Sequence, residues 1–334
     1  MAVLVTGGTG YIGSHTVLEL LDNNREVIIV DNFSNSKKEV LDSVKNISGK
    51  DFKFYEGDCR DKSFLKKIFE ENFIDSVINF AGFKAVGESC ANPLMYYDNN
   101  ITIAIALLET MQEYGCKKFI FSSTSTVYGD PEVLPLTEEC KVGGTTNPYA
   151  TTKLMIERIL SDLYQADNTF DICILRYFNP IGAHESGLIG EEPNGIPNNL
   201  MPYIMQIASG KRECLKVFGN DYDTHDGTGV RDYIHVVDLA KAHVKALDKL
   251  DREEKGLFIY NIGTGTGYSV LDIVNNFEKE NNIKIPYQIV ERRAGDVASL
   301  YSNPSKAREE LGWVAEKGIA EMCRDSWNFE KMHS

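Results

Sequence analysis

Short apolar runs alternate with stretches of helical periodicity along the first half of the chain. We expect strands at residues 3–6, 26–30, 52–55, 77–80, 119–121 and 172–175, and helices at 11–23, 38–47, 64–73, 101–114 and 153–164. Strands that alternate with helices of this length form βαβ units with parallel strands. The run at 26–30 is almost entirely apolar, which is typical of a sheet covered on both faces. The pattern predicts an α/β fold with a doubly wound parallel sheet.

The regular alternation of expected strands and helices ends near residue 180. Residues 180–200 hold four Gly, three Pro and three Asn and therefore predict a long loop. Less regular elements follow it, with helices expected at 202–209, 236–250 and 270–280. We expect a first domain at residues 1–180 and a smaller C-terminal domain at 181–334, with some of its segments returning to the first.

The charge balance narrows the range of partners. Lys and Arg number 35 against 49 Asp and Glu, which gives a formal net charge of −14. An acidic surface of this kind disfavours nucleic acid and anionic membranes. The longest apolar run, at 101–108, is too short to cross a bilayer, and no targeting segment is expected at the start. Seven scattered cysteines and no His/Cys cluster predict reduced thiols, a cytoplasmic location and no metal site.

A glycine-rich turn joins the first expected strand to the first expected helix. Residues 6–13 read Thr-Gly-Gly-Thr-Gly-Tyr-Ile-Gly, with Gly7, Gly10 and Gly13 at the spacing of a dinucleotide-binding loop. Asp31 ends the second strand eighteen residues later, where a carboxylate accepts hydrogen bonds from an adenosine ribose and repels a 2′-phosphate. The alternative is a tight turn followed by an ordinary surface Asp. With strand and helix both in place, the loop predicts a Rossmann domain that binds NAD rather than NADP.

A tyrosine and a lysine four residues apart open a later helix, after Asn147 and Pro148. Tyr149 and Lys153 share one helix face, so the ammonium can approach the phenol. A nearby cation lowers the pKa of a tyrosine from about 10 and makes it a base near neutral pH. A half-buried Tyr beside a surface Lys is the alternative for an isolated pair. In a chain that also carries a dinucleotide-binding loop, the pair predicts that Tyr149 transfers a proton in catalysis.

Longer motifs resemble a known family. The segments 6–13, 79–82, 122–129 and 149–153 resemble the extended short-chain dehydrogenases/reductases, and 84–89, 96–100, 176–180, 195–202 and 227–235 resemble the UDP-glucose 4-epimerases. The resemblance covers nearly the whole chain. It implies a homodimer in which bound NAD+ oxidises the 4-hydroxyl of a UDP-sugar and the ketone is then reduced on its opposite face.

The resemblance also implies residue roles. Tyr149 takes the O4 proton, and Lys153 binds the nicotinamide ribose and, with the cationic nicotinamide ring, holds Tyr149 as phenolate. Thr124 stands where the family usually has Ser. The implied NAD contacts are Gly7, Gly10, Tyr11, Ile12, Gly13, Asp31, Asn32, Asn35, Ser36, Asp58, Phe80, Ala81, Gly82, Lys84, Asn99, Tyr149, Lys153 and Phe178. The implied substrate contacts are Lys84, Thr124, Tyr149, Asn179, Asn199, Leu200, Lys216, Val217, Phe218, Arg231, Arg293, Asp296 and Leu300. Among these, the arginines face the diphosphate and residues 216–218 lie beside uracil.

One implied substrate contact concerns specificity. Some family members carry a Tyr at the position of Leu300, where it crowds the C2 substituent of the sugar. Leu is smaller than Tyr, so we hypothesise that the N-acetylated pair UDP-N-acetylgalactosamine and UDP-N-acetylglucosamine is also accepted. The alternative is that Leu300 is simply pocket wall.

Three other functions compete with a 4-epimerase. Nucleotide-sugar 4,6-dehydratases place an acid just after the threonine, and Ser125-Thr126-Val127 at that point argues against one. A UDP-glucuronate 4-epimerase or decarboxylase stays open and would require a C6 carboxylate on its substrate. A non-catalytic NAD-binding regulator would not need Thr124, Tyr149 and Lys153, all of which are present.

Overall fold

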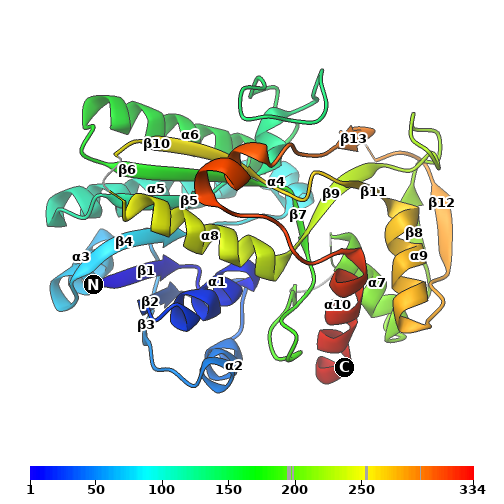
Figure 1. Cartoon of the computed structure of the whole chain (residues 1–334), viewed down its shortest axis with the longest axis horizontal. Coiled ribbons are helices and arrows are strands. Elements are labelled where there is room, and N and C mark those ends of the chain that lie inside the picture. Colours follow the sequence, from blue (N-terminus) through cyan, green and yellow to red (C-terminus); the bar gives the residue numbers. More distant parts are fainter. Residues whose placement is uncertain (194–196, 198, 253–254, 294) are drawn as a thin grey trace.

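A parallel sheet of seven strands forms the centre of the molecule (Figure 1). The computed structural model describes residues 1–193, 197, 199–252, 255–293 and 295–334. The strand order is β10-β6-β5-β4-β1-β2-β3. The strands are β1 (Ala2–Thr6), β2 (Glu26–Asp31), β3 (Lys53–Glu56), β4 (Ile74–Asn79), β5 (Lys118–Ser122), β6 (Asp171–Tyr177) and β10 (Leu257–Ile262). The predicted doubly wound parallel sheet is confirmed, and the six strands expected in the first half all belong to it.

Helices cover both faces of this sheet. Alternate residues of β1 divide between two hydrophobic clusters, with Val3 and Val5 in one and Ala2 and Leu4 in the other. The first cluster takes in α1 (Tyr11–Asp22), α2 (Glu39–Ser48) and α8 (Val236–Leu250), and the second takes in α3 (Lys62–Glu71), α5 (Pro93–Tyr114) and α6 (Pro148–Ala166). The short α4 (Val86–Ala91) precedes α5. This two-sided burial explains why the strands are apolar on both faces.

The chain returns to the first layer late in its course. α8 packs against α1, and β10 pairs in parallel with β6 at the edge of the sheet. Figure 1 shows both elements in yellow-green and yellow beside the blue and green ones of the first half. α8 and β10 are therefore part of the helical cover and of the central sheet, although both lie beyond the loop near residue 180.

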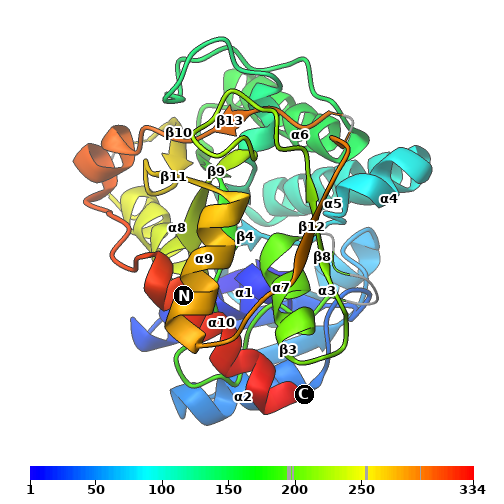
Figure 2. The ribbon, with the colours of Figure 1, turned by 90° about the vertical axis from the view of Figure 1, so that its right-hand side faces the viewer.

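A smaller second layer lies beyond the carboxyl ends of the central strands (Figure 2). β9 (Val230–His235) pairs with β7 (Asn179–Ile181), β11 (Gly267–Ser269) and β13 (Ser299–Leu300), while β8 (Leu215–Phe218) pairs with β12 (Tyr287–Val290). α7 (Leu200–Ala208), α9 (Val270–Asn281) and α10 (Ile319–His333) pack with these strands around a third cluster. The described residues include no helix long and apolar enough to cross a membrane.

Candidate active site

The glycine-rich turn between β1 and α1 is built from close backbone contacts. Gly7 has a φ of +70°, and a Cβ there would lie 2.7 Å from the Ala81 backbone nitrogen. A Cβ at Gly13 would lie 2.2 Å from the Gly7 carbonyl oxygen. These contacts hold the start of α1 and the residues after β4 tightly around the turn. The turn therefore fits the pyrophosphate of a dinucleotide, which approaches bare backbone at a helix N-terminus.

The Asp31 carboxylate is fixed at the end of β2. It accepts hydrogen bonds from the backbone N–H of Thr9 at 3.1 Å, from the backbone N–H of Phe33 at 2.9 Å and from the Ser36 hydroxyl at 3.1 Å. The side chain is mostly buried, yet it lines the cavity described next. A carboxylate held there fits a ribose diol and opposes a 2′-phosphate, as predicted for NAD.

A cavity of about 810 Å³ opens at the carboxyl ends of the central strands. β1 has β2 on one side and β4 on the other, so the cavity lies where the strand order reverses. The predicted cofactor residues that line it are Gly7, Gly10, Tyr11, Ile12, Gly13, Asp31, Asn32, Asn35, Ser36, Asp58, Phe80, Ala81, Gly82, Lys84, Asn99, Tyr149 and Lys153. Phe178 is not among the lining residues and instead packs in a hydrophobic cluster with Val127, Tyr128, Leu136 and Leu300.

Tyr149 and Lys153 lie on the cavity wall in the first two turns of α6. The Asn147 side chain caps this helix by accepting a hydrogen bond from the Ala150 N–H at 2.9 Å, and Pro148 occupies the first turn. The Lys153 ammonium donates to the Ser122 carbonyl at 2.8 Å and lies 4.8 Å from the centre of the Phe121 ring. Both side chains are buried. Lys153 contacts the end of β5 through Ser122, and Tyr149 contacts the end of β6 through Tyr177.

Burial dominates the acid–base properties of the pair. Burial raises the pKa of Tyr149 well above 10. Tyr177 raises this pKa further, and the hydrogen bond with the Thr124 hydroxyl lowers it in part. Burial lowers the pKa of Lys153 to about 8, and Glu157 opposes that shift. The prediction that the pKa of Tyr149 lies below its ordinary value is therefore wrong for the chain by itself, because burial of the phenol raises this pKa. The resemblance assigns part of the stabilisation of a Tyr149 phenolate to the cationic ring of bound NAD+.

Several residues that line the cavity were not predicted, and two of them, Tyr177 and Glu191, act on predicted site residues. Tyr177, at the end of β6, faces Tyr149 and raises its pKa. Glu191 is buried in the loop after β7, where its carboxylate accepts hydrogen bonds from the Lys84 ammonium and the Asn199 amide, each at 2.8 Å. Tyr177 stood inside the family motif at 176–180 and could have been found there. Glu191 lies in a Gly- and Pro-rich loop that carries no such signal.

The predicted substrate residues are only partly brought together. Lys84 and Tyr149 line the cavity, Thr124 contacts Tyr149, and Asn199 reaches Lys84 through Glu191. Further out, the Arg293 guanidinium pairs with Asp296 at 2.9 Å and lies 5.7 Å from the centre of the Phe218 ring, and Leu300 is the register partner of Arg231.

The remaining predicted substrate residues lie on the smaller second layer of the fold. Asn179 begins β7, Lys216 is exposed on β8, and Leu200 begins α7. Val217 is buried in the core, so only its backbone can face a ligand. Gly195, Ile196 and Asn198 of the motif at 195–202 lie outside the described residues.

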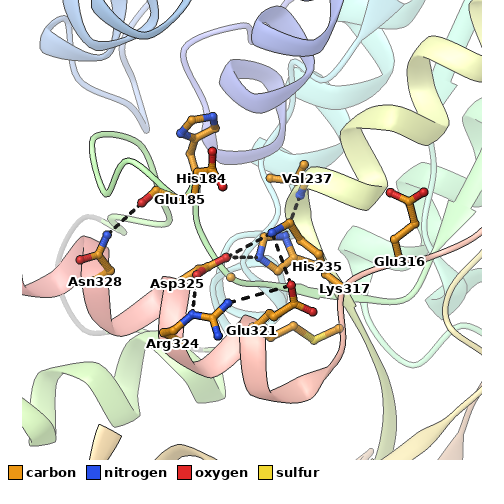
Figure 3. Close-up of polar contacts among 12 residues, drawn as sticks. His184, Glu185, His235, Val237, Glu316, Lys317, Glu321, Arg324, Asp325 and Asn328 are labelled. Atoms are coloured by element: carbon orange, nitrogen blue, oxygen red, sulfur yellow. Dashed lines mark hydrogen bonds and ion pairs between the residues drawn. The ribbon is translucent and has the colours of Figure 1, made fainter. Parts of the chain in front are cut away.

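A buried histidine ties the C-terminal helix to the cavity. His235 accepts a hydrogen bond on Nδ1 from the Val237 N–H, so its Nε2 carries the hydrogen that faces Asp325 of α10 at 3.2 Å (Figure 3). A Cβ on the neighbouring Gly182 would lie 2.8 Å from that Nε2. The Gly182 carbonyl in turn accepts a hydrogen bond from the Tyr11 hydroxyl at 2.7 Å. α10 thereby supports the wall of the cavity to which Tyr11 belongs.

Outside this site, one cluster of described residues has the composition of a metal site. Ligand atoms of His225, Asp226 and Asp272 lie within 4.8 Å of one another. Both carboxylates already accept hydrogen bonds from Ser269, the N-cap of α9, and Asp226 accepts two more from Thr228. These contacts give the carboxylates a role in capping the helix, and the absence of a metal remains a prediction.

The fold and the site together define a class of protein. A Rossmann sheet with a Tyr-x-x-x-Lys pair in the cavity at its switch point is the arrangement of an extended short-chain dehydrogenase/reductase. The family model described as GDP-mannose 4,6 dehydratase matches residues 4–326. The chain belongs, within this class, to the UDP-glucose 4-epimerase family.

Individual relatives support that assignment. The chain is 61% identical to the UDP-glucose 4-epimerase of Haemophilus influenzae over 331 residues, covering 99% of this chain and 98% of the relative. It is 56% identical to that of Homo sapiens over 337 residues, covering 99% and 97%. The solved structure of UDP-glucose 4-epimerase from Bifidobacterium longum in complex with NAD+ and UDP superposes with a TM-score of 0.96 at 53% identity, covering 99% of this chain and 98% of that one.

Proposed function

We infer that this protein is an NAD-dependent 4-epimerase that interconverts UDP-galactose and UDP-glucose through a 4-keto intermediate. The observation that carries this function is the position of Tyr149. Its buried hydroxyl lies beside Thr124, on the wall of the cavity that the glycine turn and Asp31 fit to NAD. The relatives named UDP-glucose 4-epimerase, at 61% identity over nearly the full length, support the same reaction.

The chain supplies the proton chemistry of this reaction. When bound, NAD+ accepts a hydride from C4, returns it to the ketone, and brings a positive ring charge that favours the Tyr149 phenolate. Tyr149 then takes the O4 proton as the 4-hydroxyl becomes a ketone, and gives it back when the alcohol re-forms. Thr124 orients O4 toward Tyr149. Lys153, whose pKa of about 8 leaves most of it protonated at pH 7, adds a fixed positive charge behind the base.

The two layers of the fold divide the binding. We assign NAD to residues of the central sheet and its turns, with Asp31 at the adenosine ribose. We assign the UDP group to the second layer, where Arg231 and Arg293 supply guanidinium forks that suit a diphosphate. Ser125 and Thr126, which follow Thr124, supply no acid for a 4,6-elimination. The absence of an acid after Thr124 therefore favours epimerisation over the dehydration named in the description of the family model.

The proposed function has a direct test. Purified protein is incubated with equal amounts of UDP-galactose and UDP-N-acetylgalactosamine, without added cofactor, and both sugars are followed by proton NMR. We expect UDP-galactose to reach equilibrium with UDP-glucose, since NAD regenerated in each cycle stays bound. No change in either sugar, even after NAD is added, would contradict the function and favour a uronate-specific enzyme or an inactive regulator.

Tolerance of an N-acetyl group at C2 is a finer proposal that rests on Leu300. This side chain is buried in a hydrophobic cluster with Val127, Tyr128 and Phe178, so its position is fixed. We expect the protein to act on UDP-N-acetylgalactosamine. Leu300→Tyr is expected to lower that activity at least about tenfold, because the larger ring fills the space of the acetyl group, and to spare UDP-galactose. Leu300→Met is the control of similar size, and equal N-acetyl turnover in the Tyr variant would refute the proposal.

A homodimer would cover apolar side chains that α5 and α6 leave exposed. The exposed fractions are 81% for Leu94 and 39% for Ile105 on α5, and 44% for Met155 on α6. The two helices pack against each other, so their outer faces can form one continuous surface. We expect light scattering to give twice the chain mass of 37.4 kDa for the wild type and a shift toward the monomer for Ile105→Asp. A wild-type monomer would contradict this arrangement.

We also place the protein in the cytoplasm. Its cysteines are all free thiols, four of them buried, as expected in a reducing compartment.

A further inference from the structure

A buried carboxylate lies directly behind the catalytic pair. Glu157 follows Lys153 by one helical turn on the same face of α6 and is 5% exposed. The Arg176 guanidinium grips it from β6, with Nε at 3.1 Å and 3.2 Å from the two carboxylate oxygens and Nη2 at 2.7 Å from one of them. The Ser123 hydroxyl, one residue before Thr124, also donates to Glu157. One carboxylate thus connects the catalytic helix to the segment that carries Thr124.

Arg176 extends this contact toward the substrate side. Its Nη1 donates to the Tyr128 hydroxyl at 3.0 Å, and Tyr128 donates to the Asn261 side chain at 2.7 Å. The Asn261 amide then donates to the Leu136 carbonyl at 3.0 Å. Leu136 exchanges backbone hydrogen bonds with residues 301 and 303, immediately after Leu300. We call Ser123, Glu157, Arg176, Tyr128 and Asn261 the buried polar chain.

Because the buried polar chain is shielded from water, its charges act strongly on neighbouring groups. Arg176 is 4% exposed and Asn261 is fully buried, so little water screens the groups. Near the Lys153 ammonium lie Glu157 on its own helix and the Ser122 carbonyl and Phe121 ring on β5. Tyr149 and Tyr177 line the same cavity. Glu157 is in turn paired with Arg176. Glu157 is therefore the anion that supports a protonated Lys153.

We propose that Glu157 is a positioning residue for the epimerase reaction: its contacts with Ser123 and Arg176 hold Thr124 against Tyr149, and its negative charge keeps Lys153 protonated. The proposal rests on the proposed function, since it concerns the same proton transfer. It assigns the buried polar chain a role beyond packing. Burial alone lowers the pKa of Lys153, and Glu157 is the group that opposes this shift.

The test compares pH profiles of kcat/KM for variants of the holoenzyme. Glu157→Gln keeps the shape of the side chain but removes its charge and replaces one acceptor oxygen with a donor amide group, so the pKa of Lys153 falls. We expect the basic limb of the profile to move to lower pH by about one unit, and kcat at the optimum to fall about tenfold while KM stays near that of the wild type. Glu157→Asp keeps the charge and should keep the basic limb in place. Asp162→Asn removes an exposed carboxylate from the same helix and should leave the profile unchanged.

Two further variants guard against a folding defect. Glu157→Gln leaves the buried Arg176 without its anion, so the double variant Glu157→Gln/Arg176→Gln repeats the measurement with neither charge buried. It should show the same downward movement of the basic limb. Ser123→Ala cuts only the link to the Thr124 segment and should lower kcat without moving the limb.

Wild-type turnover tests the proposed function separately from this proposal. If the wild type is an epimerase and the charge-free variants keep its basic limb, the role of Glu157 as counter-charge is refuted. If Ser123→Ala also keeps the wild-type kcat, the positioning role is refuted as well.

Discussion

Replacing Tyr149 with Phe is expected to lower kcat for UDP-galactose by about a thousandfold or more. The substitution removes one oxygen atom, and that atom is the base in the proposed reaction. The ring is 7% exposed and stays packed against the cavity wall, so the fold and the bound NAD should be retained. The measurement is the rate of UDP-glucose formation, together with the NAD content of the purified variant.

The matched control lies on the same helix. Tyr164→Phe removes a hydroxyl near the other end of α6, away from the cavity, and should keep wild-type activity. If Tyr149→Phe turned over UDP-galactose within tenfold of the wild type while holding NAD, another group would have to be the base. Tyr177 would be the first to test, because it faces Tyr149 in the same cavity.

Replacing Gly13 with Ala is expected to abolish NAD retention. The new Cβ would lie 2.2 Å from the Gly7 carbonyl oxygen and 2.9 Å from the Gly8 Cα. Both are backbone atoms, so no side-chain rotation relieves the contact, and α1 or the turn must move. Strain of this kind costs about 1–3 kcal/mol of stability, and a displaced turn no longer presents its N–H groups to a pyrophosphate.

The NAD released by denaturing the purified variant checks this expectation. The protein should carry little NAD, and its activity should fall in proportion. Gly87→Ala is the control, because a Cβ there meets nothing within 4 Å and lies in the short helix α4. A Gly13→Ala protein that carries as much NAD as the wild type would show that the turn does not bind the cofactor as proposed.

The central sheet could be predicted because its signals are local. Most expected strands of the first half are apolar runs, and all but the last of them precede an expected helix, although Lys53 interrupts the run at 52–55. α5 was expected at 101–114 but begins at Pro93, because its first turns carry polar residues that interrupt the stripe. Asn92 and Pro93 were a start signal for that helix that the periodicity did not capture. No strand is expected at 257–262, because the sequence beyond residue 180 lacks the regular alternation of strands and helices that predicts the others; the structure shows β10 there, paired with β6.

Site residues could be predicted where they belong to one short motif. They could not be predicted where segments far apart in the sequence meet. The glycine turn, Asp31 and the Tyr149–Lys153 pair each lie within a short stretch of sequence. Glu191 becomes part of the cavity only because a loop folds back to place its carboxylate against Lys84. The acid–base behaviour of Tyr149 also depends on burial, which spacing does not reveal. For the same reason the sign of its pKa shift was wrong when judged from the neighbouring lysine alone.

Isotope transfer tests the central claim most directly. UDP-galactose that carries deuterium at C4 is incubated with the purified protein in ordinary water, without added cofactor, and the product is examined by NMR and mass spectrometry. A tightly held NAD that takes a hydride from C4 and returns it to the same sugar predicts UDP-glucose with deuterium retained at C4. UDP-glucose with hydrogen at C4 would contradict the account, because the transferred atom would then have come from solvent or from an exchangeable cofactor.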